Sequence, residues 1–107
     1  RSPVPVRLSL DLDGRLPEPI EAAAYYLVCE ALTNTAKHAH ASKATVQISR
    51  RDGQVLVEVA DDGRGGADMA AGSGLRGLAD RVAALDGRLV IDSDAGGSAI
   101  RAEMPCA

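Results

Sequence analysis

Hydrophobic and polar residues alternate near the N-terminus, and a period of two is typical of a β-strand with one buried face. The apolar members are Val4, Val6, Leu8, Leu10 and Leu12. The same alternation returns over residues 44–49 and 55–59, and Asp52-Gly53 between them is a strong signal for a tight hairpin. We therefore predict a half-buried strand at the N-terminus and a β-hairpin in the middle of the chain.

Two other stretches predict helices. Glu18 or Pro19 can open a helix that we expect to run to about Ala39, before a turn at 41–43. Gly87 later stands where a helix C-cap belongs. The apolar residues of this second helix recur at helical spacing, at Leu75, Leu78, Val82 and Leu85.

Residues 89–91 and 100–104 predict a second hairpin, which turns at Gly96-Gly97. Strands paired in hairpins, with helices gathered on one face, predict a two-layer α+β sandwich. The length of 107 residues fits a single domain over 1–107. The first residues, Arg-Ser-Pro without an initiator Met, suggest a piece of a longer protein.

The amino-acid composition excludes some classes of function. The chain has two Tyr and no Phe or Trp, so the core must be built from Val, Leu, Ile and Ala. Scarce aromatic residues and a net charge of −3 argue against a nucleic-acid partner. Cys29 and Cys106 lack metal-ligand spacing, and reduced thiols in a cytosolic setting are expected. The sequence has no apolar run of membrane-spanning length, so no direct membrane contact is expected.

Four polar residues share one face of the first predicted helix. Glu30, Asn34, Lys37 and His38 stand at i, i+4, i+7 and i+8 and fall within roughly a quarter turn. A carboxylate can accept a proton, an amide oxygen suits magnesium, and Lys and His can donate to phosphate oxygens. This face fits phosphoryl transfer, but a single helix face does not decide between that chemistry and an ordinary solvated surface.

A first glycine-rich segment, DDGRGG over residues 61–66, directly follows the strand at 55–60. A carboxylate at a strand end can accept a hydrogen bond from a ligand, while the glycines let the backbone approach closely. A surface turn would have the same composition, since Asp and Gly dominate turns.

A second glycine-rich segment, GSGLRG over residues 72–77, opens the second helix, where free N–H groups can cradle an anion. It matches G-x-G-x-x-G, but the dinucleotide-binding fingerprint needs a strand immediately before it, and the nearest predicted strand ends far upstream. The sequence contains no P-loop motif. A third segment, Gly96-Gly97-Ser98, fits a simple β-turn. A role in a binding site is favoured only because Ser98 starts a strand that could pair near Asp61.

Taken together, these segments resemble the GHKL superfamily of Bergerat-fold ATPases, and specifically the catalytic domain of sensor histidine kinases. EALTNTAKHA (30–39) is similar to the family's N box, DDGRGG to its first glycine box and GSGLRGLADRV (72–82) to its second. GGSAIRAEMP is similar to the closing strand, and the short interval between Asp61 and Gly74 resembles the short-lid subgroup. The resemblance implies a mixed, mainly antiparallel sheet of about five strands with helices on one face.

The resemblance also implies roles for individual residues. At the adenine end, Asp61 would accept a hydrogen bond from the exocyclic amine, helped by Ser98 through water. At the phosphate end, Asn34 would ligate magnesium beside Glu30, which matches a residue often proposed as a proton acceptor. The remaining residues would let the backbone approach the base (Gly63, Gly65), contact phosphate oxygens through side chains (Lys37, His38), or offer backbone amides and a guanidinium (Gly74, Leu75, Arg76).

By this resemblance the domain would bind ATP and magnesium in the cytoplasm. It would phosphorylate a histidine on a separate dimerisation domain, and the phosphate would pass on to a response regulator. The parent kinase could be membrane-anchored. Two alternatives stay open: an anti-sigma-factor-type serine kinase of the same superfamily, and a non-catalytic module that binds a nucleotide or a protein partner. Gly66 replaces the bulky apolar residue common after the first glycine box, which implies a looser adenine pocket.

Overall fold

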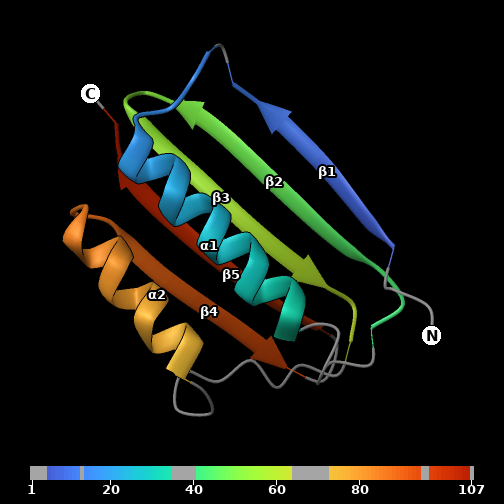
Figure 1. The fold of residues 1–107 in the computed structure, drawn as a ribbon. Coiled ribbons are helices and arrows are strands. Elements are labelled where there is room, and N and C mark those ends of the chain that lie inside the picture. The colour runs from blue at the N-terminus through green and yellow to red at the C-terminus, as the bar shows by residue number, and fades with distance from the viewer. Residues whose placement is uncertain (1–4, 13, 35–40, 64–72, 95–96, 107) are drawn as a thin grey trace.

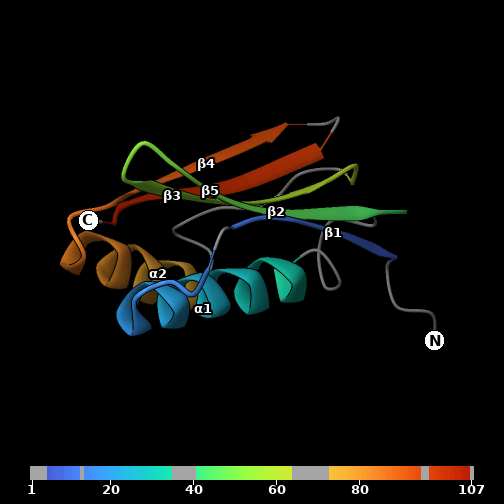
Figure 2. The ribbon, with the colours of Figure 1, turned by 90° about the horizontal axis from the view of Figure 1, so that it is seen from above.

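A five-stranded sheet carries two helices on one of its faces (Figures 1 and 2). The structure is a computed structural model that describes residues 5–12, 14–34, 41–63, 73–94 and 97–106. Its elements are β1 (Val6–Asp11), α1 (Glu18–Asn34), β2 (Ala44–Arg51), β3 (Gln54–Asp61), α2 (Ser73–Ala84), β4 (Arg88–Asp94) and β5 (Gly97–Pro105). None of the described helices is long and apolar enough to span a membrane.

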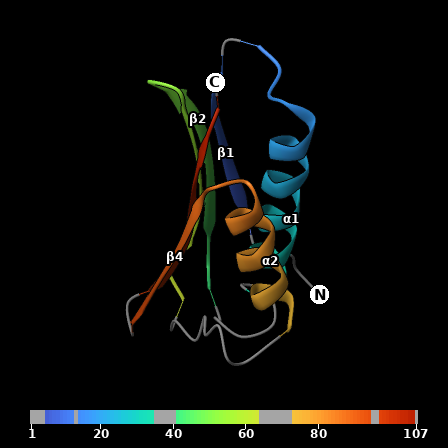
Figure 3. The same cartoon turned by 90° about the vertical axis from the view of Figure 1, so that its left-hand side faces the viewer.

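The strand order is β1-β2-β3-β5-β4. Among the described strands, the β1–β2 pair is parallel and the other three pairs are antiparallel. The predicted fold, a two-layer α+β sandwich with a mixed, mainly antiparallel sheet and helices on one face, is confirmed. Seen along the sheet, both helices lie on the same side (Figure 3).

The central hairpin forms as predicted. Asp52 and Gly53 both have positive φ, 55° and 75°, as a two-residue turn of type I′ requires. This turn sets the register of β2 on β3, which places Val46 opposite Val59 and Ile48 opposite Val57. The apolar face of the hairpin therefore points at the helices.

The core lies between the sheet and the helices, and it is aliphatic as the composition requires. The largest fully buried side chains are Leu27, Leu78, Met104, Val55, Val57 and Val82. Among the described residues, α1 packs mainly on β3 and β5, while α2 packs on β4 and β5. Both cysteines are free thiols, with Cys29 exposed and Cys106 buried.

The prediction of a half-buried strand at the N-terminus is only partly right. β1 forms, but all six of its residues are exposed. Alternation tells which residues share a face, but it does not tell whether another element covers that face. Here α1 lies over β3 and β5, so the apolar side of β1 at the sheet edge stays open.

The second helix ends in a capping motif that includes Gly87, as predicted, but Gly87 is not its left-handed residue. Gly87 N–H bonds to the Val82 carbonyl at 2.9 Å and Asp86 N–H to the Ala83 carbonyl at 3.0 Å, which together form a Schellman motif. The left-handed residue of that motif is Asp86, with φ 60°, rather than Gly87. Gly87 is needed for a different reason, because a Cβ there would lie 2.5 Å from the carbonyl oxygen of Glu103.

Candidate functional site

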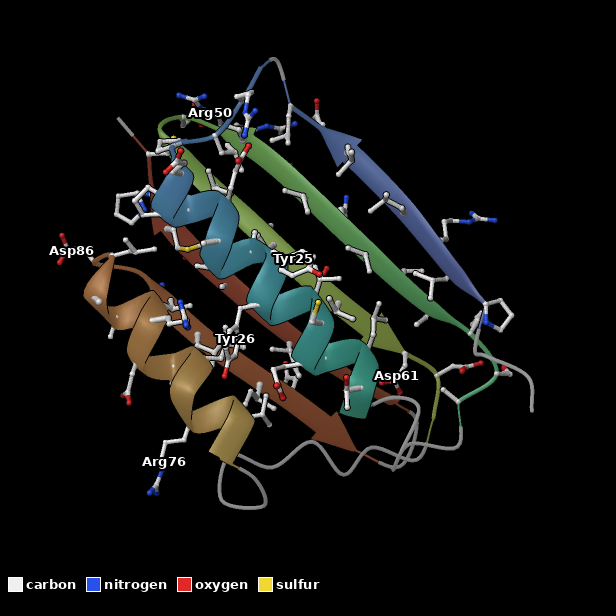
Figure 4. All side chains as sticks on the ribbon, viewed as in Figure 1. Tyr25, Tyr26, Arg50, Asp61, Arg76 and Asp86 are labelled. Carbon is white, nitrogen blue, oxygen red and sulfur yellow. The ribbon has the colours of Figure 1, made fainter. Side chains whose placement is uncertain are left out.

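Four chain segments that the sequence singled out meet at one end of the sandwich. The C-terminal end of α1, the N-terminal end of α2, the end of β3 and the start of β5 all lie there (Figure 1). They do so because α1 and α2 run in opposite directions across the same face of the sheet (Figures 1 and 2). Asp61 lies beside the end of α1 in Figure 4.

Asp61 is the last residue of β3, and its half-buried carboxylate accepts hydrogen bonds from Gly63 and Ser98. The Gly63 N–H donates to Oδ1 at 2.9 Å, and the Ser98 hydroxyl donates to Oδ2 at 2.8 Å. The second bond follows from the pairing of β3 with β5, which places Ser98 directly opposite Asp61. The predicted neighbourhood of these two residues is confirmed, and the hydroxyl bonds to the carboxylate directly.

Gly97 is a residue of this site to which the sequence alone assigned no role beyond the turn and the start of the closing strand. It has φ 149°, and a Cβ placed on it would overlap the carbonyl oxygen of Asp61. Only glycine therefore lets β5 start so close to Asp61 and deliver Ser98 to the carboxylate. The glycine pair before Ser98 was the available signal, but a pair of glycines does not reveal what the backbone approaches.

Asp62 is a second residue whose role was missed. Its carboxylate accepts hydrogen bonds from the Ser42 hydroxyl, from the Ser42 N–H at 2.9 Å and from the Lys43 N–H at 3.1 Å. These bonds, led by the Ser42 hydroxyl and the Lys43 N–H, hold the pKa of the Asp62 carboxyl below its usual value. Asp62 thus fastens the segment that enters β2 to the start of the first glycine-rich segment.

The face of α1 that turns toward α2 carries positions 30 and 34 of the predicted polar stripe. Tyr26 lies on this face, with the Arg81 guanidinium 4.7 Å above its ring centroid. Glu30 follows one turn later on the same face and is half-buried, and position 34 follows after another turn. A Cβ on Gly77 of α2 would meet the Tyr26 hydroxyl at 3.2 Å, so the two helices are in close contact.

The first turn of α2 holds the second glycine-rich segment. Gly74 lies in this turn, and Leu75 is buried against the core at 3% exposure. The N–H groups of a first helical turn have no partner within their helix and carry the positive end of the helix dipole. Arg76 is exposed and points away from the sheet in Figure 4, so its guanidinium stands apart from Asp61 in this conformation.

Several predicted site residues lie outside the described residues. These are Lys37 and His38 of the first helix and Gly65 of the first glycine-rich segment. The helix includes position 34, but the structure does not describe the Asn34 side chain. Within the described part of the chain, no three His, Cys, Asp or Glu side chains gather as a metal cluster would require.

A shallow hollow of about 210 Å³ adjoins Asp61 at the ends of β2 and β3. Its lining includes Thr45 and Ala60, which face each other across the hairpin on the side away from the helices. This hollow shares Asp61 with the predicted site but extends to the side of the hairpin away from the helices. Its other lining residues are Lys43, Ala44 and Asp62.

Comparison with known proteins finds relatives of this chain in sequence and in structure. A family model described as "Histidine kinase-, DNA gyrase B-, and HSP90-like ATPase" matches residues 20–107. The signal transduction histidine-protein kinase/phosphatase DegS of Brevibacillus brevis is 44% identical over 80 residues, which make up 72% of this chain and 21% of that protein. Sensor histidine kinase MctS of Rhizobium johnstonii is 35% identical over 89 residues, covering 78% of this chain and 19% of that protein.

Solved structures agree with the sequence matches. The blue-light activated histidine kinase of Erythrobacter litoralis EL346 superimposes with a TM-score of 0.84 at 26% identity, over 99% of this chain and 36% of that one. This chain thus spans about a fifth of the length of the two curated relatives and about a third of the solved one.

Proposed function

Because the chain belongs to the family of histidine kinase-, DNA gyrase B- and HSP90-like ATPases, we propose that it binds ATP with magnesium and supplies the γ-phosphate to a histidine on a separate dimerisation domain. The observation that carries the proposal is the hydrogen-bonded group of Asp61, Gly63 and Ser98. This group lies at the end of the sandwich where α1 ends and α2 begins.

Asp61 provides the adenine end of the site. An ionised carboxylate only accepts hydrogen bonds, and it offers about four acceptor positions, so it can take an N–H from the exocyclic amine of adenine. The bonds from Gly63 and Ser98 fix the orientation of this carboxylate before any ligand arrives. Such preorganisation lowers the entropy lost on binding.

The phosphate end is formed by α2 and α1. The N–H groups around Gly74, Leu75 and Arg76 in the first turn of α2 suit a polyphosphate, because a helix N-terminus attracts anions. On α1, Glu30 and Asn34 lie one turn apart and offer oxygen ligands. Magnesium fits this donor set, since it takes one or two protein oxygens together with phosphates and water. Bound there, it would neutralise phosphate charge, and Lys37 and His38 would contact phosphate oxygens.

Transfer of the γ-phosphate needs positioning and charge neutralisation more than covalent chemistry from the protein. A histidine nitrogen of the dimerisation domain would bond to the γ-phosphorus as the bond to the β-phosphate oxygen breaks, releasing ADP. The phosphate would then pass to a response regulator, and the reaction would take place in the cytoplasm. The names of the relatives, which are sensor histidine kinases, favour this acceptor over the serine of an anti-sigma factor.

Nucleotide binding is tested by titrating the chain with a fluorescent ATP analogue and magnesium. Asp61→Asn removes an acceptor and its charge, so the loss of a charge-assisted hydrogen bond of about 1.5–3 kcal/mol predicts roughly 10- to 100-fold weaker binding. Asp52→Asn is the matched control, because it makes the same chemical change in a turn at the other end of β3. Equal affinities of the two variants would refute the proposed role of Asp61.

The acceptor assignment has its own test. His38 and His40 are the only histidines in the chain, and both lie in or next to the segment assigned to the nucleotide. We expect the isolated chain to bind nucleotide without labelling itself when it is incubated with γ-labelled ATP. Acid-labile phosphate accumulating on these 107 residues would contradict the assignment of a separate acceptor domain.

A further inference from the structure

The face of β1 that lies on the helix side of the sheet is apolar and exposed. Val6, Leu8 and Leu10 are 47%, 61% and 58% exposed, and they follow one another on the same face of the strand. Their partners across the sheet are Ala44, Val46 and Ile48, which face the helix layer. The three exposed residues therefore continue the core face of the sheet beyond the area that α1 covers.

The adjacent side of α1 is also partly open. Tyr25 is 74% exposed and points about 100° around the helix axis from Tyr26, which faces α2. Val28 and Leu32 share this side of the helix and are half-buried. Figure 4 shows Tyr25 on the part of α1 that looks toward β2 and β1. We call this surface the β1–α1 step. Its floor is Val6, Leu8 and Leu10, and its wall is Tyr25, Val28 and Leu32.

The dimensions of the step fit one further helix. α1 packs on β3 and β5, which lie two and three strands away from β1. At about 4.8 Å per strand, β1 is therefore displaced by about 10–14 Å from α1, which leaves room for a helix packed about 8–10 Å from α1. The six residues of β1 extend about 20 Å, the length of a helix of about 13 residues.

We propose that the β1–α1 step is a docking surface for an amphipathic helix of the same polypeptide, from a part outside residues 1–107. A helix can contact the floor and the wall of the step together. The sheet of a second copy could not reach the floor, because α1 lies one layer above β1 and would block its approach. Additional polypeptide is expected, because this chain accounts for 36% of the solved relative and 21% of the first curated one. Burying the three floor residues would complete the helix layer over all five strands.

The test compares thiol accessibility in two proteins, the 107-residue chain and the full-length gene product that contains it. Leu8→Cys places a thiol on the floor of the step, and Ser9→Cys places one on the opposite face of the same strand as the matched control. Both are made in a Cys29→Ser background, because Cys29 is exposed while Cys106 is buried. Labelling rates with iodoacetamide are then measured, and Leu10→Cys repeats the floor measurement at a second position.

We expect the thiols at positions 8 and 10 to react at least tenfold more slowly in the longer protein, and the thiol at position 9 to react equally in both. Equal rates at positions 8 and 10 in the two proteins would overturn the proposal. So would protection within the 107-residue chain that grows with concentration alongside a dimeric mass, since a second copy would then cover the step.

Nucleotide binding by the same samples separates this inference from the proposed function. The step lies on the side of α1 away from α2, so the cysteine variants should bind the fluorescent ATP analogue with unchanged affinity. Absent nucleotide binding together with protected thiols would remove the proposed function and leave the docking surface standing. Normal nucleotide binding with unprotected thiols would overturn the docking surface and leave the proposed function standing.

Discussion

Replacing Gly97 by alanine probes the close contact that places Ser98 on Asp61. The new Cβ would overlap the Asp61 carbonyl oxygen, and a residue with a side chain would also have to adopt φ 149°. Positive φ costs an L-residue about 1–2 kcal/mol. Forcing extra atoms into a packed contact costs about 1–3 kcal/mol. We therefore expect Gly97→Ala to lower the free energy of unfolding by about 2–5 kcal/mol.

Gly14→Ala is the matched control for this experiment. Gly14 has nearly the same backbone angle, φ 158°, but a Cβ there would meet nothing within 4 Å. Its substitution should therefore cost only the backbone strain of about 1–2 kcal/mol. The difference between the two variants isolates the overlap with Asp61.

Urea denaturation at equilibrium gives the free energy of unfolding for both variants, and titration with the fluorescent ATP analogue gives their affinities. Gly97→Ala should also weaken nucleotide binding, because β5 must move Ser98 away from Asp61 to relieve the overlap. Equal destabilisation by the two substitutions, with unchanged affinity in both, would refute the reasoning that Gly97 positions the site.

Three further experiments test individual contacts of the fold. Asp86→Gly should raise the free energy of unfolding by about 0.5–1 kcal/mol in urea denaturation, because glycine relieves the left-handed conformation that ends α2; a loss of stability would contradict this reading. Gly77→Ala inside α2 should gain about 1 kcal/mol of helix propensity and lose part of it by crowding the Tyr26 hydroxyl, so the substitution should stabilise the chain more in a Tyr26→Phe background than in the natural sequence; purely additive effects in the double-mutant cycle would count against the contact. The Ser42 hydroxyl and the Lys43 N–H lower the pKa of Asp62, so Asp62 contributes stability that is present above about pH 3.9 and lost as pH falls through its lowered pKa. Asp62→Asn should flatten the acid limb of a stability–pH profile, and an unchanged limb would show that these bonds do not stabilise the fold.

Much of the fold could be predicted because local signals agreed with one another. Asp52-Gly53 specified a two-residue turn, and the alternation on both of its arms then fixed which side chains face the helices. Ser98 was expected to start a strand that could pair near Asp61, and the observed pairing of β3 with β5 places it there. The family resemblance is confirmed by the match over residues 20–107 and by the sensor histidine kinases among the relatives.

The features that could not be predicted depend on neighbours far away in the sequence. Asp62 bonds to Ser42, 20 residues earlier, and the DDGRGG segment contains no sequence signal for that contact. Gly87 does belong to the capping motif that ends α2, but its lack of a side chain is required by the carbonyl group of Glu103, 16 residues later in the sequence. The exposure of β1 depends on which strands the helices cover, and alternation along one strand holds no information about that.

The roles proposed for Lys37, His38 and Gly65 stay predictions, as does that of the Asn34 side chain. They rest on the resemblance of the N box and the first glycine box. Arg76 also stays a prediction, and its outward orientation means that a contact with phosphate through the guanidinium would require the side chain to turn. Backbone contacts from the first turn of α2 need no such movement.

The central claim is that one end of the sandwich holds the nucleotide, with the base at the end of β3 and the phosphates at the start of α2. Titration of the ¹⁵N-labelled chain with a non-hydrolysable ATP analogue and magnesium, followed by NMR, tests it most directly. We predict saturable shifts at the amides of Gly63, Leu75 and Ser98, with the Asp52-Gly53 turn at the far end unchanged. Shifts confined to the far end, or none at millimolar nucleotide, would contradict the account.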